Sequence, residues 1–105
     1  MVYLNKSEIW KWKNLDISWS LSKKSSGEDN INILLVHGFG ASKKHWRHNQ
    51  NFLGQFFNCY AIDLIGFGES SQPSALLNYE SNKQNSIKYS FDLWSNQITT
   101  FCSEI

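Results

Sequence analysis

The sequence is poor in the features that mark several specialised classes of protein. Its 105 residues contain one proline and two cysteines, and the formal charge at pH 7 is +1. Two cysteines, Cys59 and Cys102, are too few for a disulfide framework or a zinc-ligand set, so we expect both to be buried free thiols. A charge near zero provides no field to attract nucleic acid or acidic lipid, and we expect neither as a partner.

Long apolar segments are also missing. No apolar run approaches the ~20 residues that a membrane-spanning helix needs, and residues 1–8 lack the apolar core of a signal peptide. The Walker A motif, G-x-x-x-x-G-K-S/T, does not occur, which excludes a P-loop nucleotide site. These absences favour a soluble, cytoplasmic protein without a membrane span.

What is present is typical of a globular chain. Hydrophobic residues make up 41% of the sequence and include five Trp, seven Phe and four Tyr, which is enough to build a core. There is neither an internal repeat nor a linker, so residues 1–105 are expected to form one domain. That length is about half of what a mostly parallel α/β domain usually needs, which indicates an incomplete unit.

The first part of the chain has the pattern of a hairpin. Tryptophans alternate with lysines over residues 10–13, and apolar residues alternate with serines over residues 17–22. This period of two places one face of each strand in a core, and residues 14–16 are the expected turn. The lysines protect an edge strand, which explains the mixture of basic and aromatic residues without a nucleic-acid site.

The next segment has the pattern of a βαβ unit. Residues 31–36 form an unbroken apolar run, typical of a strand buried on both faces of a sheet. A helix is expected from Ser42, its N-cap, to Leu53, with Gly54 as a stop signal, and residues 60–64 form the second strand. The apolar stripe expected on this helix consists of Trp46, Phe52, Leu53 and Phe56.

The last part of the chain combines a loop with an amphipathic helix. Residues 72–88 are rich in Ser and Asn and contain the only proline, which predicts a surface loop. Ser90 is the expected N-cap of a final helix that must pack on a face of the sheet. Its apolar stripe consists of Phe91, Trp94, Ile98, Phe101, Cys102 and Ile105.

Two turns follow the two core strands, and the first one suggests chemistry. Gly38 and Gly40 allow a sharp turn after residue 36 and leave the backbone N–H groups uncovered. Such donors at the carboxyl end of a strand can bind an oxyanion, and Phe39 N–H is the candidate donor. The glycines are also explained by conformation alone, so the turn by itself does not establish a function.

The second turn also contains two glycines, together with polar residues that can stabilise its conformation. Asp63 ends the second core strand, Gly66 and Gly68 allow a bend with positive φ, and Ser70 can hydrogen-bond to the backbone of the loop. We interpret these residues as a structural motif rather than as a site.

These motifs together resemble those of a known family. Residues 37–42, 45–47, 63–70, 72–73 and 89–94 are similar to α/β-hydrolases of the cyanobacterial and plastid group that includes chlorophyll dephytylases and pheophytinases. The resemblance implies the N-terminal half of an α/β-hydrolase fold, with an antiparallel opening hairpin, a βαβ unit, a following helix and an incomplete sheet. It also implies hydrolysis of a carboxylic ester without a cofactor.

In that family, the residue that matches Phe39 supplies half of the oxyanion hole through its N–H. The other half follows the nucleophilic serine on a G-x-S-x-G turn, which this sequence lacks. The acid and the histidine of the triad also come later in the family, and His37 belongs to the turn rather than acting as a base. We therefore expect a chain truncated before the nucleophile and inactive alone, whose longer relatives hydrolyse a small-molecule ester.

Three other interpretations were weighed. His45 and His48 could share a metal, but no third ligand is suggested, so no metal site is expected. A dinucleotide-binding βαβ unit would need a third glycine, and Lys43 stands at that position. A non-catalytic remnant or interaction module is the main alternative to an enzyme.

The resembling fold orders its strands 1-2-4-3-5. The strand at residues 31–36 would then have no neighbour on one side, because the fifth strand is missing from this chain. We expect self-association or a partner at this open edge, and an isolated chain that is poorly soluble or only partly folded.

Overall fold

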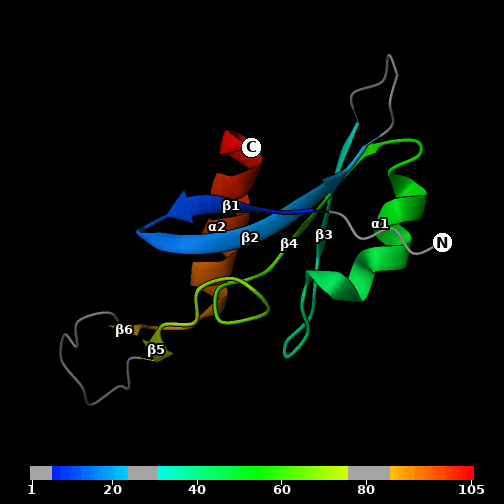
Figure 1. Cartoon of the computed structure of the whole chain (residues 1–105). Coiled ribbons are helices and arrows are strands. Elements are labelled where there is room, and N and C mark those ends of the chain that lie inside the picture. Colours follow the sequence, from blue (N-terminus) through cyan, green and yellow to red (C-terminus); the bar gives the residue numbers. More distant parts are fainter. Residues whose placement is uncertain (1–5, 24–30, 76–85) are drawn as a thin grey trace.

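A computed structural model describes residues 6–23, 31–75 and 86–105. Its main sheet has the strand order β1-β2-β4-β3 (Figure 1). The sheet begins with an antiparallel hairpin, β4 pairs antiparallel with β2, and β3 runs parallel to β4. The mixed α/β architecture expected from the sequence is therefore confirmed. The four strands are β1 (Ser7–Trp12), β2 (Leu15–Ser22), β3 (Asn32–Val36) and β4 (Asn58–Ile62).

The hairpin turn lies one residue earlier than expected. Lys13 and Asn14 have φ angles of 51° and 61°, and Trp12 pairs directly with Leu15. A two-residue turn with both residues left-handed matches the twist of the strands that it joins. Leu15 and Asp16 therefore belong to β2 rather than to the turn.

The helices begin at the expected caps. The Ser42 side chain accepts a hydrogen bond from Lys44 N–H at the start of η1, a 3-10 turn that continues into α1. The Ser90 side chain accepts one from Leu93 N–H at the start of α2. The elements are η1 (Lys43–Trp46), α1 (Arg47–Leu53) and α2 (Phe91–Glu104).

The two long helical segments pack on opposite faces of the sheet. Phe101 of α2 packs edge-to-face with Trp19, whereas Gln50 of α1 hydrogen-bonds to Ser20, the next residue of β2. Successive residues of a strand point to opposite faces, so α1 and α2 cover different sides. The core on the α2 side contains Trp10, Trp12, Ile17, Ile62, Ile65 and Phe101.

The α1 side is more polar than the sequence suggested. The expected apolar stripe of α1 is wrong, because Phe52 and Phe56 are exposed and the buried side chain is Gln50. Gln50 Nε2 donates to the carbonyl oxygens of Ser20 and Cys59 at 3.2 and 3.0 Å, which ties α1 to β2 and β4. The serines of β2 are small enough to let α1 approach the sheet.

Gly54 ends α1 for a reason other than conformation. Its φ is −65°, an ordinary helical value. A Cβ at this position would lie 1.9 Å from Ser22 Oγ, so glycine is required by the close approach of the helix end to β2.

Three further expectations need correction. β3 is half-buried rather than buried on both faces, since its described neighbours lie on one side only. Cys59 is buried but Cys102 is exposed. Two short strands, β5 (Ser74–Ala75) and β6 (Ser86–Ile87), pair in parallel within the stretch expected to be loop. Among the described helices, none has the length and apolar character needed to span a membrane.

Candidate functional site

The first turn lies directly after β3. Ala41 N–H donates to Gly38 O at 3.2 Å, which closes a tight turn with Phe39 and Gly40 at its centre. Gly40 has a φ of 79°, which favours glycine. A Cβ at Gly38 would meet nothing within 4 Å. The turn is therefore open on the side of Gly38.

Phe39 is the most exposed large hydrophobic residue of this turn, with 90% of its surface accessible. Its ring packs edge-to-face on Phe67, which belongs to the turn after β4, at a centroid distance of 5.3 Å. No hydrogen bond among the described residues uses the Phe39 N–H. This donor is thus available to a ligand.

His37 links the first turn to the segment after β4. Its buried ring donates from Nδ1 to Gly38 O at 2.7 Å, and Nε2 accepts from Leu64 N–H at 3.0 Å. This network defines a neutral imidazole with the proton on Nδ1. Because both ring nitrogens are occupied, His37 is not free to act as a general base in this arrangement.

The second turn is organised around the carboxylate of Asp63, which is fully buried. Its oxygens accept from Lys43 N–H at 2.6 Å, from Lys43 Nζ at 3.0 Å and from Glu69 N–H at 2.9 Å. A Cβ at Gly68, whose φ is 56°, would lie 2.4 Å from this carboxylate. Glycine at position 68 therefore leaves room for the buried acid.

Ser70 and Gly66 attach the second turn to its surroundings. Ser70 Oγ donates to Asp63 O at 2.7 Å and accepts from Ser18 N–H of β2 at 2.9 Å. Gly66 has a φ of 94°, and a Cβ there would lie 2.6 Å from the Tyr89 ring. The turn after β4 is thereby fixed to β2 on one side and to the start of α2 on the other.

Two buried polar residues complete this network, and sequence reasoning missed both. Lys43 is only 4% exposed and forms ion pairs with Asp63 and Glu69. The hydrogen bond and the charge of Lys43 lower the pKa of the Glu69 carboxyl. Gln97 of α2 accepts from Ile65 N–H at 3.0 Å and donates to Asp63 O at 3.1 Å. The position of Gln97 within the apolar stripe of the last helix was an available signal, whereas Lys43 is flanked by Ser42 and Lys44 and no local pattern marks it as buried.

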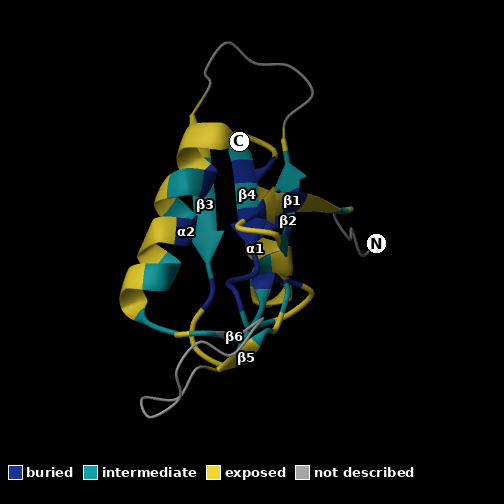
Figure 2. Cartoon of the chain, turned by 90° about the vertical axis from the view of Figure 1, so that its left-hand side faces the viewer, coloured by how far each residue is buried: buried dark blue, intermediate teal, exposed yellow. Residues whose placement is uncertain are grey.

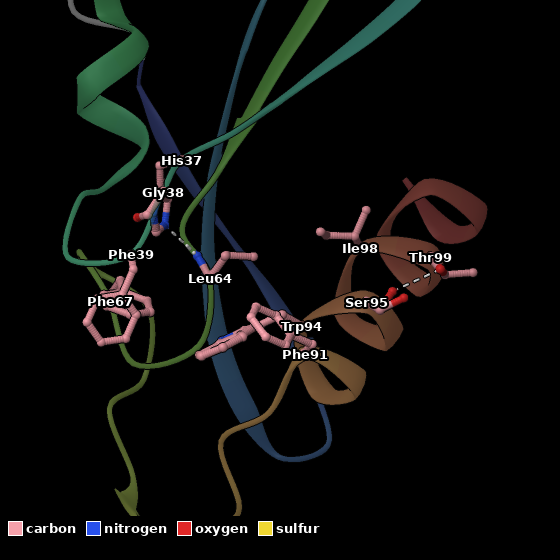
Figure 3. Close-up of a pocket in the computed structure, with 10 residues that line it drawn as sticks. All are labelled: His37, Gly38, Phe39, Leu64, Phe67, Phe91, Trp94, Ser95, Ile98 and Thr99. Carbon is pink, nitrogen blue, oxygen red and sulfur yellow. Dashed lines mark hydrogen bonds between the residues drawn. The ribbon is translucent and has the colours of Figure 1, made fainter.

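The first turn opens onto an apolar cleft of about 510 Å³ (Figure 3). Figure 3 shows the turn on one side and α2 on the other, with Ile98 pointing from α2 toward the turn and Thr99 pointing away from His37. Among the residues that line the cleft, His37 is the one titratable side chain. The lining consists of His37, Gly38, Phe39, Leu64, Phe67, Phe91, Trp94, Ser95, Ile98 and Thr99.

The two other histidines are not part of this site. His45 and His48 are exposed on η1 and α1. Within residues 6–23, 31–75 and 86–105, no three His, Cys, Asp or Glu side chains are grouped as metal ligands would be. Lys43 stands where a dinucleotide-binding motif would have its third glycine, and its side chain forms ion pairs with Asp63 and Glu69.

Comparison with known proteins gives one consistent result. Residues 31–103 match the model of the family described as alpha/beta hydrolase fold. The chain is 33% identical over 69 residues to the pimeloyl-acyl-carrier protein methyl ester esterase of Salmonella newport. That match covers 66% of this chain and 25% of the relative, so the chain spans about a quarter of the length of the curated relatives it matches.

Solved structures agree with this assignment. A bacterial membrane phospholipase A superposes with a TM-score of 0.71 and 27% identity, covering 94% of this chain and 27% of the phospholipase. The thioesterase domain from the curacin biosynthetic pathway superposes with a TM-score of 0.74 and 18% identity, covering 98% of this chain and 34% of that domain. The second likeness shows the fold alone.

Proposed function

Because the chain belongs to the α/β-hydrolase fold family, we propose that it supplies the oxyanion-binding turn of a carboxylic ester hydrolase. The observation that carries this proposal is the Phe39 N–H, which is unused among the described hydrogen bonds and lies on a turn beside an apolar cleft. The bond from Leu64 N–H to His37 and the left-handed Gly40 hold this turn in place. A fixed donor stabilises developing negative charge without reorganising during the reaction.

The proposed reaction is nucleophilic attack by a serine on the ester carbonyl. The carbonyl oxygen gains negative charge as the tetrahedral intermediate forms, and Phe39 N–H would donate to it. The serine would come from outside residues 1–105, since the sequence contains no G-x-S-x-G turn. We therefore expect the chain alone to hydrolyse p-nitrophenyl esters no faster than the buffer does.

Two similarities to known proteins support the proposed substrate class. The curated relative is a methyl ester esterase, and the family resemblance of the sequence motifs likewise implies a carboxylic ester. The aromatic lining of the cleft suits an apolar acyl or alcohol portion. We propose a carboxylic ester with an apolar portion and leave its length open.

A binding experiment tests the turn without requiring turnover. We would titrate the ¹⁵N-labelled chain with octylphosphonate, an anion that mimics the tetrahedral intermediate and carries an apolar tail. We expect the Phe39 amide to shift most and Trp94 fluorescence to change. One charge-assisted hydrogen bond with apolar contacts supports roughly millimolar affinity.

Two variants make this experiment specific. Gly40→Ala places a side chain at a φ of 79° and should abolish the Phe39 shift by deforming the turn. Gly38→Ala meets nothing within 4 Å and serves as the matched control. Unchanged Phe39 resonances at saturating phosphonate, in a chain whose other amides show native dispersion, would contradict the proposal.

A further inference from the structure

A second cleft, of about 280 Å³, lies on the α1 face of the sheet. Side chains of η1 and α1 form one wall, and Glu69 of the turn after β4 forms another. The third wall comes from Ser7 of β1 and Ser20 of β2, which pair directly opposite each other. Figure 2 shows β1 and β3 on opposite sides of β4, so this cleft lies on the side of the sheet away from β3. It shares no lining residue with the cleft at Phe39.

The floor of this cleft is polar and fixed. Ser20 and Gln50 are each 3% exposed, and Gln50 Nε2 donates to Ser20 Oγ at 3.1 Å. The Lys43 ammonium, which also lines the cleft, is held by two carboxylates. An apolar group placed against these atoms would gain little from burial, so the floor favours a polar ligand.

Two exposed cationic side chains at this cleft have donors to spare. The one carboxylate contact of Lys44 among the described residues is Glu69, at 3.6 Å, and both of these side chains are more than half exposed. Arg47 Nη1 donates to Lys44 O at 3.0 Å, and the other N–H groups of Arg47 have no partner among the described hydrogen bonds. Lys44 and Arg47 can therefore both donate to a ligand.

The charges around the cleft do not cancel. Two carboxylates, those of Asp63 and Glu69, contact Lys43. With Lys44 and Arg47 included, the cations exceed these carboxylates by one positive charge. The hydrogen bond and the charge of Lys43 lower the pKa of the Glu69 carboxyl, although about half of that side chain is exposed. The cleft thus stabilises negative charge even close to solvent.

We propose that this cleft binds a phosphate group. The planar fork of arginine and the ammonium of lysine are the side chains best suited to phosphate oxygens, and Ser7 adds a hydroxyl donor. A phosphate monoester offers three oxygens to donors on different walls of the cleft, whereas a carboxylate offers two. Inorganic phosphate, a soluble phosphate monoester and a phospholipid headgroup share this chemistry.

This inference goes beyond the proposed function and does not rest on Phe39. Titration of the ¹⁵N-labelled chain with inorganic phosphate tests it, with chloride added to hold the ionic strength constant. We expect saturable shifts of the Ser7, Lys44 and Glu69 amides and none at Phe39. Two or three charge-assisted hydrogen bonds at a cleft open to solvent support a roughly millimolar dissociation constant.

Variants of opposite effect make the titration specific. Arg47→Gln should weaken phosphate binding about tenfold by removing charge-assisted hydrogen bonds. Lys88→Gln removes the same charge from an exposed residue outside the cleft and should leave the affinity unchanged.

Glu69→Gln should strengthen binding several-fold, because it removes a carboxylate that competes for Lys43 and Lys44. Glu104→Gln, at an exposed residue of α2 on the opposite face of the sheet, makes the same change in charge and is the matched control. Circular dichroism verifies that each variant is folded.

Vesicles of equal parts phosphatidylcholine and phosphatidate distinguish the sources of the phosphate. A chain that binds inorganic phosphate and stays in the supernatant uses a soluble phosphate, and we expect this result, since a formal charge of +1 provides little attraction to an acidic membrane. A chain that binds inorganic phosphate and also sediments with the vesicles uses a headgroup. Shifts that do not saturate, equal effects of Arg47→Gln and Lys88→Gln, or equal effects of Glu69→Gln and Glu104→Gln would overturn the inference.

Discussion

At the scale of single residues, buried polar side chains connect the two turns to the rest of the sheet. Lys43 bridges Asp63 and Glu69, and its ammonium and the Asp63 carboxylate are almost completely buried. A buried ion pair gains little net stability over apolar packing, but removing one partner leaves the other charge uncompensated. The contribution of the network to stability is therefore measured by the loss in free energy of unfolding when one partner is removed.

Lys43→Met tests this weight. We expect the free energy of unfolding to fall by about 3–5 kcal/mol, because Asp63 loses its cation in a site closed to water. Lys44→Met is the matched control, since Lys44 also contacts Glu69, but both of these side chains are more than half exposed. Its loss should change stability by less than about 1 kcal/mol in urea denaturation. Equal effects of the two substitutions would contradict the role assigned to Lys43.

At the scale of elements, local sequence patterns predicted those helices, strands and turns whose formation depends on neighbouring residues. The alternation in residues 10–22, the apolar run at 31–36 and the serine caps gave the hairpin, the βαβ unit and the helix starts. The buried side of α1 was not predictable in the same way. Its contact is Gln50 against backbone carbonyls of two strands distant in sequence, and no periodicity of apolar residues reports such a contact.

The packing of α1 on β2 gives a test at this scale. Gly54→Ala places a Cβ 1.9 Å from Ser22 Oγ and should destabilise the chain by about 1–3 kcal/mol, since the helix end must move off the strand. Removing the Ser22 side chain in a Gly54→Ala, Ser22→Gly double variant should recover part of that loss. Urea denaturation of the two single variants and the double variant gives the coupling energy, and strictly additive effects would show that the two residues are not in conflict.

At the scale of the whole molecule, the sheet and the candidate site were predictable to different degrees. The strand order of the described sheet, with β3 at one end, agrees with the expectation drawn from the family resemblance. The place of Phe39 at the mouth of an apolar cleft depends on how α2 lies against the turn after β3, which no local pattern specifies. Its role as an oxyanion donor stays a prediction.

The rates at which the two thiols react with a labelling reagent distinguish local opening from global unfolding of this molecule. Cys102 is exposed and should react with a thiol reagent at once. Cys59 lies in β4, between β2 and β3, and burial raises its pKa to about 11, so the folded chain holds it as an unreactive protonated thiol at neutral pH. In a Cys102→Ser variant, Cys59 is the one remaining cysteine. Its labelling requires opening of the central strand, so we expect its labelling rate to be lower than that of an exposed thiol by the equilibrium constant for global unfolding. A sheet that folds cooperatively protects its central strand most strongly from labelling. Rapid labelling of Cys59 in that variant would therefore indicate the partly folded state expected for an isolated chain.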